Sequence, residues 1–128
     1  MTSSALFLLA RVLLASSFIG HGLETVLKAF RVLGAGEAVS FGALVFDVIL
    51  IIAGIVVIVG WQLQWVALLL AAFLLVDAFV SHRFWRYTGA ELHNQLLHFL
   101  KNLTMLGGFL LLAWAASAGQ VATVPGQI

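Results

Sequence analysis

The chain has 128 residues, of which 63% are hydrophobic and 9% are charged, whereas soluble domains are about 25% charged. This composition excludes a soluble globular domain. The chain has no cysteine, which excludes disulfides, thiolate zinc sites, iron–sulfur clusters and covalently attached haem. Its six basic and five acidic residues give a net charge of +1, too little for the basic stripe that binds nucleic acid. We therefore expect the lipid bilayer, and no nucleic acid, to be a partner.

Four apolar runs are long enough to cross a membrane as helices. We place these spans at about 5–23, 41–60, 63–81 and 96–116. The prediction is an all-α integral membrane four-helix bundle that forms a single four-span domain over residues 1–128. Arg11 falls inside the first run, where a signal peptide would have no charge, so we expect this span to be retained. We also expect the long side chain of Arg11 to reach outward to the interface.

The connections between the runs predict two further features. Residues 24–40 place apolar and charged side chains on opposite helix faces, which indicates an amphipathic segment along the membrane interface, ended by Gly34 and Gly36. Thr88 and Glu91 have the spacing of a capping box. We therefore expect the fourth helix to begin near Gly89, before its apolar part.

Ionisable side chains inside spans cost about 2.5 to 3.5 kcal/mol each, so they usually face the protein interior and are paired or functional. At 1.5 Å per residue, four helices place such groups within about 10 Å of the same membrane face. These groups are His21, Asp47, Asp77, His98 and Lys101. We expect them to meet in a shallow hydrated cavity that exchanges a proton.

The fourth helix carries a polar stripe that leads toward this level. Its members recur at intervals of four and three residues and are Glu91, Gln95, His98, Asn102 and Met105. Two aspartates in one site of low dielectric favour either a protonated carboxyl group or a protonated His98. The alternative to a ligand site is a purely structural ion pair between Asp77 and Lys101.

Metal and haem sites are poorly supported by the histidine spacing. His93 and His98 are five residues apart and point to different helix faces, unlike the i, i+4 pair of a helical metal site. We therefore expect no metal. A non-covalent haem b between His21 and His98 is disfavoured, although the two lie at matching depth. His82 and His93 are expected at the surface, outside any site.

Several segments together resemble the DoxX family of small bacterial membrane proteins. They are Ala10–Ala15, Gly20-His21-Gly22, Gly60-Trp61, His82–Trp85 and the run from Gln95 to Leu103 followed by Gly107-Gly108. The resemblance implies a four-helix, multi-pass protein of the bacterial inner membrane. The family is similar to a membrane subunit of thiosulfate:quinone oxidoreductase, which implies protein partners in a membrane redox complex.

The resemblance has two departures. Family members usually carry a lysine where this chain has Thr25, and often a carboxylate where it has Leu50, with Asp47 one turn away. Both departures concern residues that would form a catalytic site in relatives, so the version in this chain is shifted or altered.

From the residues and the resemblance we predict a subunit or anchor of a membrane redox complex with a proton-coupled site for a quinone headgroup. As an enzyme it is at most a non-autonomous subunit of a quinone-linked oxidoreductase. The catalytic candidates are His98, Asp77, Lys101 and Asp47, and the cofactor-binding candidates are His98, Asn102 and His21. The alternative is a structural accessory subunit of a larger membrane assembly with no ligand.

Overall fold

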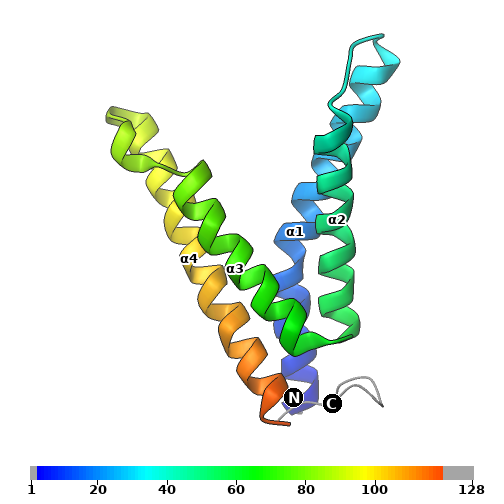
Figure 1. The fold of residues 1–128 in the computed structure, drawn as a ribbon, viewed down its shortest axis with the longest axis vertical. Coiled ribbons are helices and arrows are strands. Elements are labelled where there is room, and N and C mark those ends of the chain that lie inside the picture. Colours follow the sequence, from blue (N-terminus) through cyan, green and yellow to red (C-terminus); the bar gives the residue numbers. More distant parts are fainter. Residues whose placement is uncertain (1–2, 120–128) are drawn as a thin grey trace. The chain divides into compact units, whose positions relative to one another are not determined.

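A computed structural model describes residues 3–119, and these residues fold into helices joined by short connections (Figure 1). The long helices are α1 (Ser3–Gly34), α2 (Phe41–Val59), α3 (Leu63–Ser81) and α4 (Gly89–Ser117), with a 3₁₀ turn, η1 (Phe84–Arg86), between α3 and α4. All four long helices are long and apolar enough to cross a membrane. The predicted class, an all-α membrane protein with four spans, is confirmed.

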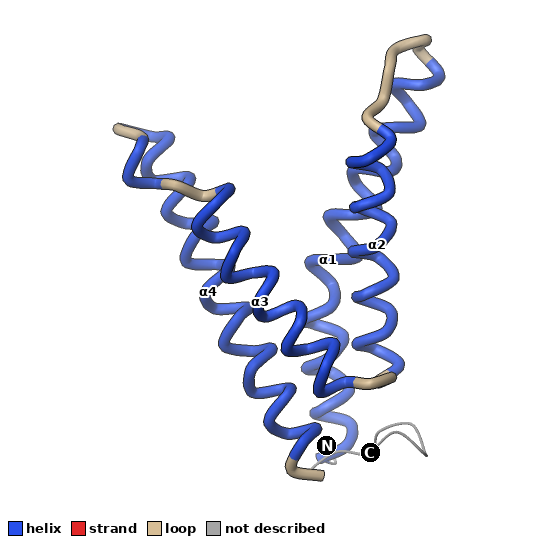
Figure 2. Tube along the Cα trace, in the orientation of Figure 1, coloured by secondary structure: helices blue, strands red, loops and turns tan. Residues whose placement is uncertain are grey.

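The helices form two compact units, Met1–Trp61 and Gln62–Ile128. In the first unit α1 packs antiparallel to α2, and in the second α3 packs antiparallel to α4, with η1 against α4 (Figures 1 and 2). Each unit is therefore a helical hairpin with its own buried face. The grouping of all four spans into one domain stays a prediction.

The first hairpin is held by close approach of its backbones. A Cβ added at Gly22 would lie 2.7 Å from the carbonyl oxygen of Asp47, and one added at Gly54 would lie 3.3 Å from that of Ala15. A methyl group at Gly22 would therefore force the helices apart, and one at Gly54 would press on the Ala15 carbonyl, so both glycines allow α1 and α2 to approach closely. Small residues at helix interfaces in membranes have this role generally.

The boundaries differ from the expected ones mainly in α1. Residues 24–34 are helical, as predicted, but they continue α1 without a break instead of forming a separate interfacial segment. No proline or glycine interrupts the chain between Gly22 and Gly34, so the helix continues to Gly34, and Gly36 follows with φ of 79°. The charges in this part pair along the helix surface, as Lys28 Nζ lies 2.6 Å from Glu24 Oε1.

The ends of the other helices follow local signals. The side chain of Ser40 accepts a hydrogen bond from the Ala43 N–H at 3.3 Å and begins α2, while Gly60, with φ of 85°, ends it. Helix α4 begins at Gly89, as predicted, but Thr88 makes no side-chain capping bond. The predicted capping box is therefore wrong, because Glu91 instead accepts a hydrogen bond from Gln95 at 2.8 Å.

Candidate functional site

The second hairpin contains a connected group of polar side chains centred on Asp77, which we call the Asp77 network. Its members are Asp77, Ser81, His82, Glu91, Gln95, His98 and Asn102. Asn102 is only 4% exposed, and its side-chain amide donates to Asp77 Oδ2 at 2.7 Å. The Ser81 hydroxyl donates to Asp77 Oδ1 at 2.6 Å. Both carboxylate oxygens of Asp77 are therefore hydrogen-bonded.

His82 connects this carboxylate to α4. Its Nε2 lies 3.6 Å from Asp77 Oδ2, and its Nδ1 lies 3.0 Å from Gln95 Oε1. The ring also stacks on that of His98, with centroids 5.1 Å apart and planes inclined by 21°. The His82 side chain is 22% exposed and that of Asp77 is 28% exposed, so the network reaches the surface at both groups.

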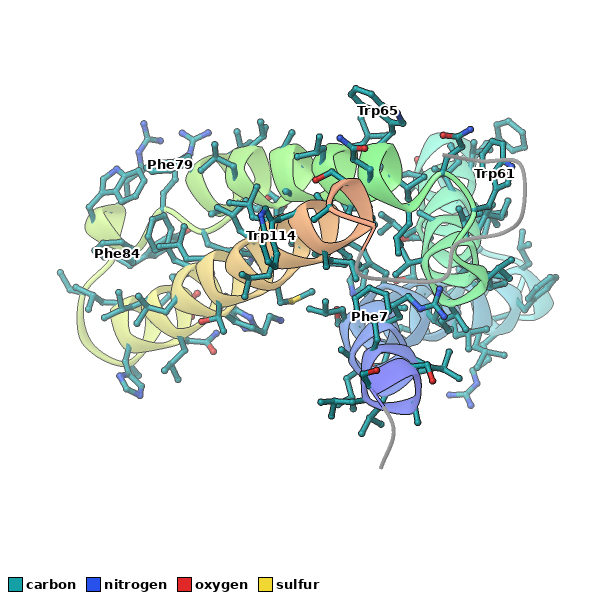
Figure 3. All side chains as sticks on the ribbon, turned by 90° about the horizontal axis from the view of Figure 1, so that it is seen from below. Phe7, Trp61, Trp65, Phe79, Phe84 and Trp114 are labelled. Carbon is teal, nitrogen blue, oxygen red and sulfur yellow. The ribbon has the colours of Figure 1, made fainter. Side chains whose placement is uncertain are left out.

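Aromatic rings surround the same end of the hairpin. Phe99, next to His98, meets Phe79 edge-on at 5.3 Å and Phe84 at 5.2 Å between centroids. Trp85 contacts Phe84 at 5.3 Å. Figure 3 shows Phe79 and Phe84 at the end of α3 where η1 lies, and Trp65 at the opposite end of that helix. The Asp77 network thus lies beside an apolar, aromatic cluster.

The first hairpin holds a second imidazole and carboxylate pair. His21 Nε2 of α1 lies 3.9 Å from Asp47 Oδ1 of α2. Asp47 is 4% exposed, whereas the His21 side chain is 65% exposed. This pair sits beside Gly22, where an added Cβ would lie 2.7 Å from the Asp47 carbonyl oxygen.

The predicted site residues thus fall into two groups. Asp77, His98 and Asn102 belong to one network, as the polar stripe predicted, whereas His21 and Asp47 pair in the other hairpin. The meeting of all these groups in one cavity stays a prediction. Lys101 is exposed and forms no ion pair within residues 3–119, so the alternative of an Asp77–Lys101 pair is not what the structure contains.

Sequence reasoning missed His82 and Ser81. His82 was expected at the surface, but the chain turns back after α3 and brings its ring between Asp77 and Gln95. Ser81 follows Asp77 by four residues, and this spacing alone could have revealed their contact on one helix face. His93 is exposed, as expected.

The side chain of Arg11 extends from α1 to the C-terminal end of α2. Its guanidinium fills the space that a Cβ at Gly60 would need, at the C-terminal end of α2. It also lies 5.4 Å from the centroid of the Phe7 ring. Its Nε is buried and has no hydrogen-bond partner within residues 3–119. Arg11 therefore packs partly inside the first hairpin, with its charge at the negative end of the α2 dipole.

The Asp77 network can donate and accept hydrogen bonds and exchange protons with a bound polar group. Asn102 and the imidazoles offer N–H donors, and Asp77 offers carboxylate oxygens. Within the part of the chain that the structure describes, no group of three or more His, Asp and Glu side chains is placed to hold a metal ion. The absence of a metal stays a prediction.

Comparisons with known proteins agree with this architecture. The profile of the DoxX family matches residues 6–83. The Inner membrane protein YphA of Escherichia coli (strain K12) is 28% identical over 114 residues, which cover 84% of this chain and 81% of YphA. No solved structure matches the chain. The relative and the four apolar helices confirm the predicted multi-pass location in the inner membrane, and the chain belongs to the DoxX family.

Proposed function

We propose that this chain is the membrane subunit of a quinone-linked redox complex and that the Asp77 network binds the quinone headgroup. The observation that carries the proposal is the contact of His82 with Asp77, at 3.6 Å, next to the amide donor Asn102. A carboxylate and an imidazole in contact can pass a proton. A quinone carbonyl that becomes a hydroxyl needs a proton from such a group.

The location of the network supports a ligand that partitions into the lipid bilayer. Helix α4 has 29 residues and is therefore about 43 Å long, which exceeds the roughly 30 Å hydrocarbon core. The network lies in its first half, beside the rings of Phe84, Trp85 and Phe99. A flat headgroup could rest against these rings while its isoprenoid tail lies along the exposed apolar side chains of the hairpin.

The candidate residues have distinct roles in this proposal. Asn102 and His98 donate hydrogen bonds to the quinone carbonyl, Asp77 exchanges the proton, and the exposed Lys101, one turn after His98, adds positive charge. Asp47 and His21 form a supporting pair in the first hairpin. Reduction of a quinone takes two electrons and two protons, and the electrons come from a partner subunit with a redox centre.

Isosteric replacements test the headgroup site. We expect Asp77→Asn and His98→Gln to weaken binding of decylubiquinone to the protein in lipid nanodiscs about tenfold, which is 1.4 kcal/mol. They should lower quinone-linked turnover of the complex purified from native membranes. Glu37→Gln and His93→Gln change the same groups at exposed positions and serve as controls. Unchanged binding and turnover in both site variants would refute the proposal.

A second candidate function is a structural accessory subunit without a ligand. It is favoured by the hydrogen bond from Asn102 to Asp77, which by itself ties α4 to α3. In this case Asp77→Asn should reduce the amount of assembled complex, while each surviving complex turns over at the normal rate. Turnover per assembled complex therefore distinguishes the two functions.

A further inference from the structure

The connection between α3 and α4 carries two arginines without an acidic partner. Arg83 directly precedes η1, and Arg86 is its last residue. Neither arginine forms an ion pair within residues 3–119. Asp77 and Glu91, the acidic residues of this hairpin, accept hydrogen bonds from uncharged side chains instead. Within the described part of the chain, the connection therefore holds two positive charges that no carboxylate neutralises.

The backbone of η1 fixes the direction of both arginines. The Arg86 N–H donates to the Arg83 carbonyl oxygen at 3.0 Å and closes the 3₁₀ turn. Side chains three residues apart eclipse each other in such a turn, so Arg83 and Arg86 leave it on the same side. Arg83 Nε donates to the Val80 carbonyl oxygen at 3.0 Å, in the last turn of α3, where carbonyls lack a helical donor. This bond holds the guanidinium and leaves its terminal nitrogens, Nη1 and Nη2, for a ligand.

Aromatic contacts hold the residue between the arginines in place. The ring of Trp85 lies 5.3 Å from that of Phe84 and 6.3 Å from those of Phe79 and Phe99, between centroids. Trp85 is nevertheless 52% exposed, and Tyr87, which follows η1, is 42% exposed. The turn thus offers an exposed aromatic surface that is already ordered, which lowers the entropy cost of binding a ligand.

The length of α3 places η1 at the level of the lipid headgroups. Helix α3 has 19 residues and is therefore about 28 Å long, close to the roughly 30 Å hydrocarbon core. The residues directly after a helix of this length lie at the membrane interface. Tryptophan and tyrosine are enriched at this level, which agrees with the exposure of Trp85 and Tyr87. Arg83 and Arg86 therefore lie at the height of the lipid phosphates.

We propose that Arg83 and Arg86 form a binding site for the headgroup phosphate of an anionic phospholipid, with Trp85 and Tyr87 against the lipid below it. Guanidinium groups bind phosphate oxygens through paired N–H···O hydrogen bonds. Phosphatidylglycerol suits this site, because its headgroup has a phosphate and no cation. The choline group of phosphatidylcholine compensates the charge of its own phosphate, so two arginines attract this lipid less.

Quenching of tryptophan by brominated lipid measures which lipid lies beside η1. The other three tryptophans, Trp61, Trp65 and Trp114, are exposed, so replacing them with Phe leaves Trp85 as a single reporter in the full chain. In phosphatidylcholine vesicles that contain brominated phosphatidylglycerol, we expect Trp85 to prefer the anionic lipid by about fivefold or more. A second variant retains only Trp65, at the opposite end of α3 (Figure 3), and should have no such preference. Equal preference at both reporters would overturn the proposal.

Three arginine variants test whether the site needs the guanidinium fork. Arg86→Gln should lower the preference at Trp85 about fivefold, because it removes one charge near the membrane surface. Arg86→Lys keeps the charge but loses the planar pair of donors, so it should restore only part of the preference. Arg31→Gln removes an exposed arginine of the first hairpin and should leave Trp85 unaffected. An unchanged preference in Arg86→Gln, or a full one in Arg86→Lys, would overturn the proposal.

A competition experiment distinguishes a lipid headgroup from a soluble phosphate. Inorganic phosphate, added at constant ionic strength to vesicles with Trp85 as the reporter, should leave the preference for phosphatidylglycerol unchanged. Its loss would assign the arginines to a soluble phosphate and contradict the lipid site. This comparison keeps both arginines, so it tests the proposal even if Arg86→Gln does not fold. No quinone is present in any of these measurements, so their outcome is independent of the proposed headgroup site at Asp77.

Discussion

The side-chain amide of Asn102 on α4 lies 2.7 Å from Asp77 Oδ2 on α3. This bond joins two helices at a place where Asn102 is almost fully buried. Side-chain hydrogen bonds between membrane helices contribute about 0.6 kcal/mol on average and up to about 1.7 kcal/mol. The bond therefore fixes the register of the second hairpin more than it adds to its stability.

We expect Asn102→Ala to lower the free energy of unfolding by about 1 to 2 kcal/mol, since it removes the bond and leaves Asp77 with one donor fewer. Unfolding by SDS in mixed micelles measures this change. Thr104→Ala is the control, because the Thr104 hydroxyl bonds only to Leu100 of its own helix and its side chain is exposed. Equal losses in the two variants would contradict a special role for Asn102.

Gly22 and Gly20 offer a matched test of helix contact in the first hairpin. Gly22→Ala places a methyl group 2.7 Å from the Asp47 carbonyl oxygen, so the helices must separate, and overpacking of this kind costs about 1 to 3 kcal/mol. At Gly20 nothing lies within 4 Å of an added Cβ. Gly20→Ala should therefore be neutral, or stabilising by up to about 1 kcal/mol through helix propensity. The same unfolding assay compares them, and similar destabilisation by both would refute the close contact.

The pairing of Gly60 with Arg11 predicts a coupled effect. Gly60→Ala forces a side chain to adopt φ of 85°, which costs about 1 to 2 kcal/mol, and it also displaces the Arg11 guanidinium. In an Arg11→Ala background only the backbone cost remains. A double-mutant cycle should give a coupling of about 0.5 to 3 kcal/mol, and a coupling near zero would show that the two sites are independent.

The residues at the starts of α2 and α4, Ser40 and Thr88, should respond differently to alanine. Ser40 accepts a hydrogen bond from the Ala43 N–H, and loss of such a cap costs about 1 kcal/mol. Thr88 makes no capping bond, so Thr88→Ala should be nearly neutral. Unfolding free energies of the two variants check this. A larger loss at Thr88 would show that the capping box forms after all.

The fold was predictable because lipid imposes its length and polarity on each span. The predicted runs 41–60 and 63–81 agree with α2 and α3 to within a residue, since turn residues bound them closely. The end of α1 was harder to predict. Glu24 and Lys28 are charged residues of the kind that end a membrane span, but they pair with each other on an unbroken helix. Charge marks the edge of the lipid, whereas the end of α1 is marked by Gly34 and by Gly36, which has a positive φ.

The contacts of the Asp77 network were predictable where both partners lie on helices. The intervals of three and four residues along α4 identified Gln95, His98 and Asn102, and depth along α3 identified Asp77. His82 could not be found in this way, because its position depends on how the chain leaves α3 and turns into η1. No periodicity describes such a turn, and the ring that connects Asp77 to Gln95 comes from it.

The division of the chain between Trp61 and Gln62 has a consequence for biosynthesis. Asp47 contacts His21 within the first half, and Asp77 contacts Asn102 and His82 within the second half. Each half can therefore leave the translocon as a pair of helices whose acidic group already has its partner. Neither half therefore needs the other half to supply a polar partner for its acidic side chain.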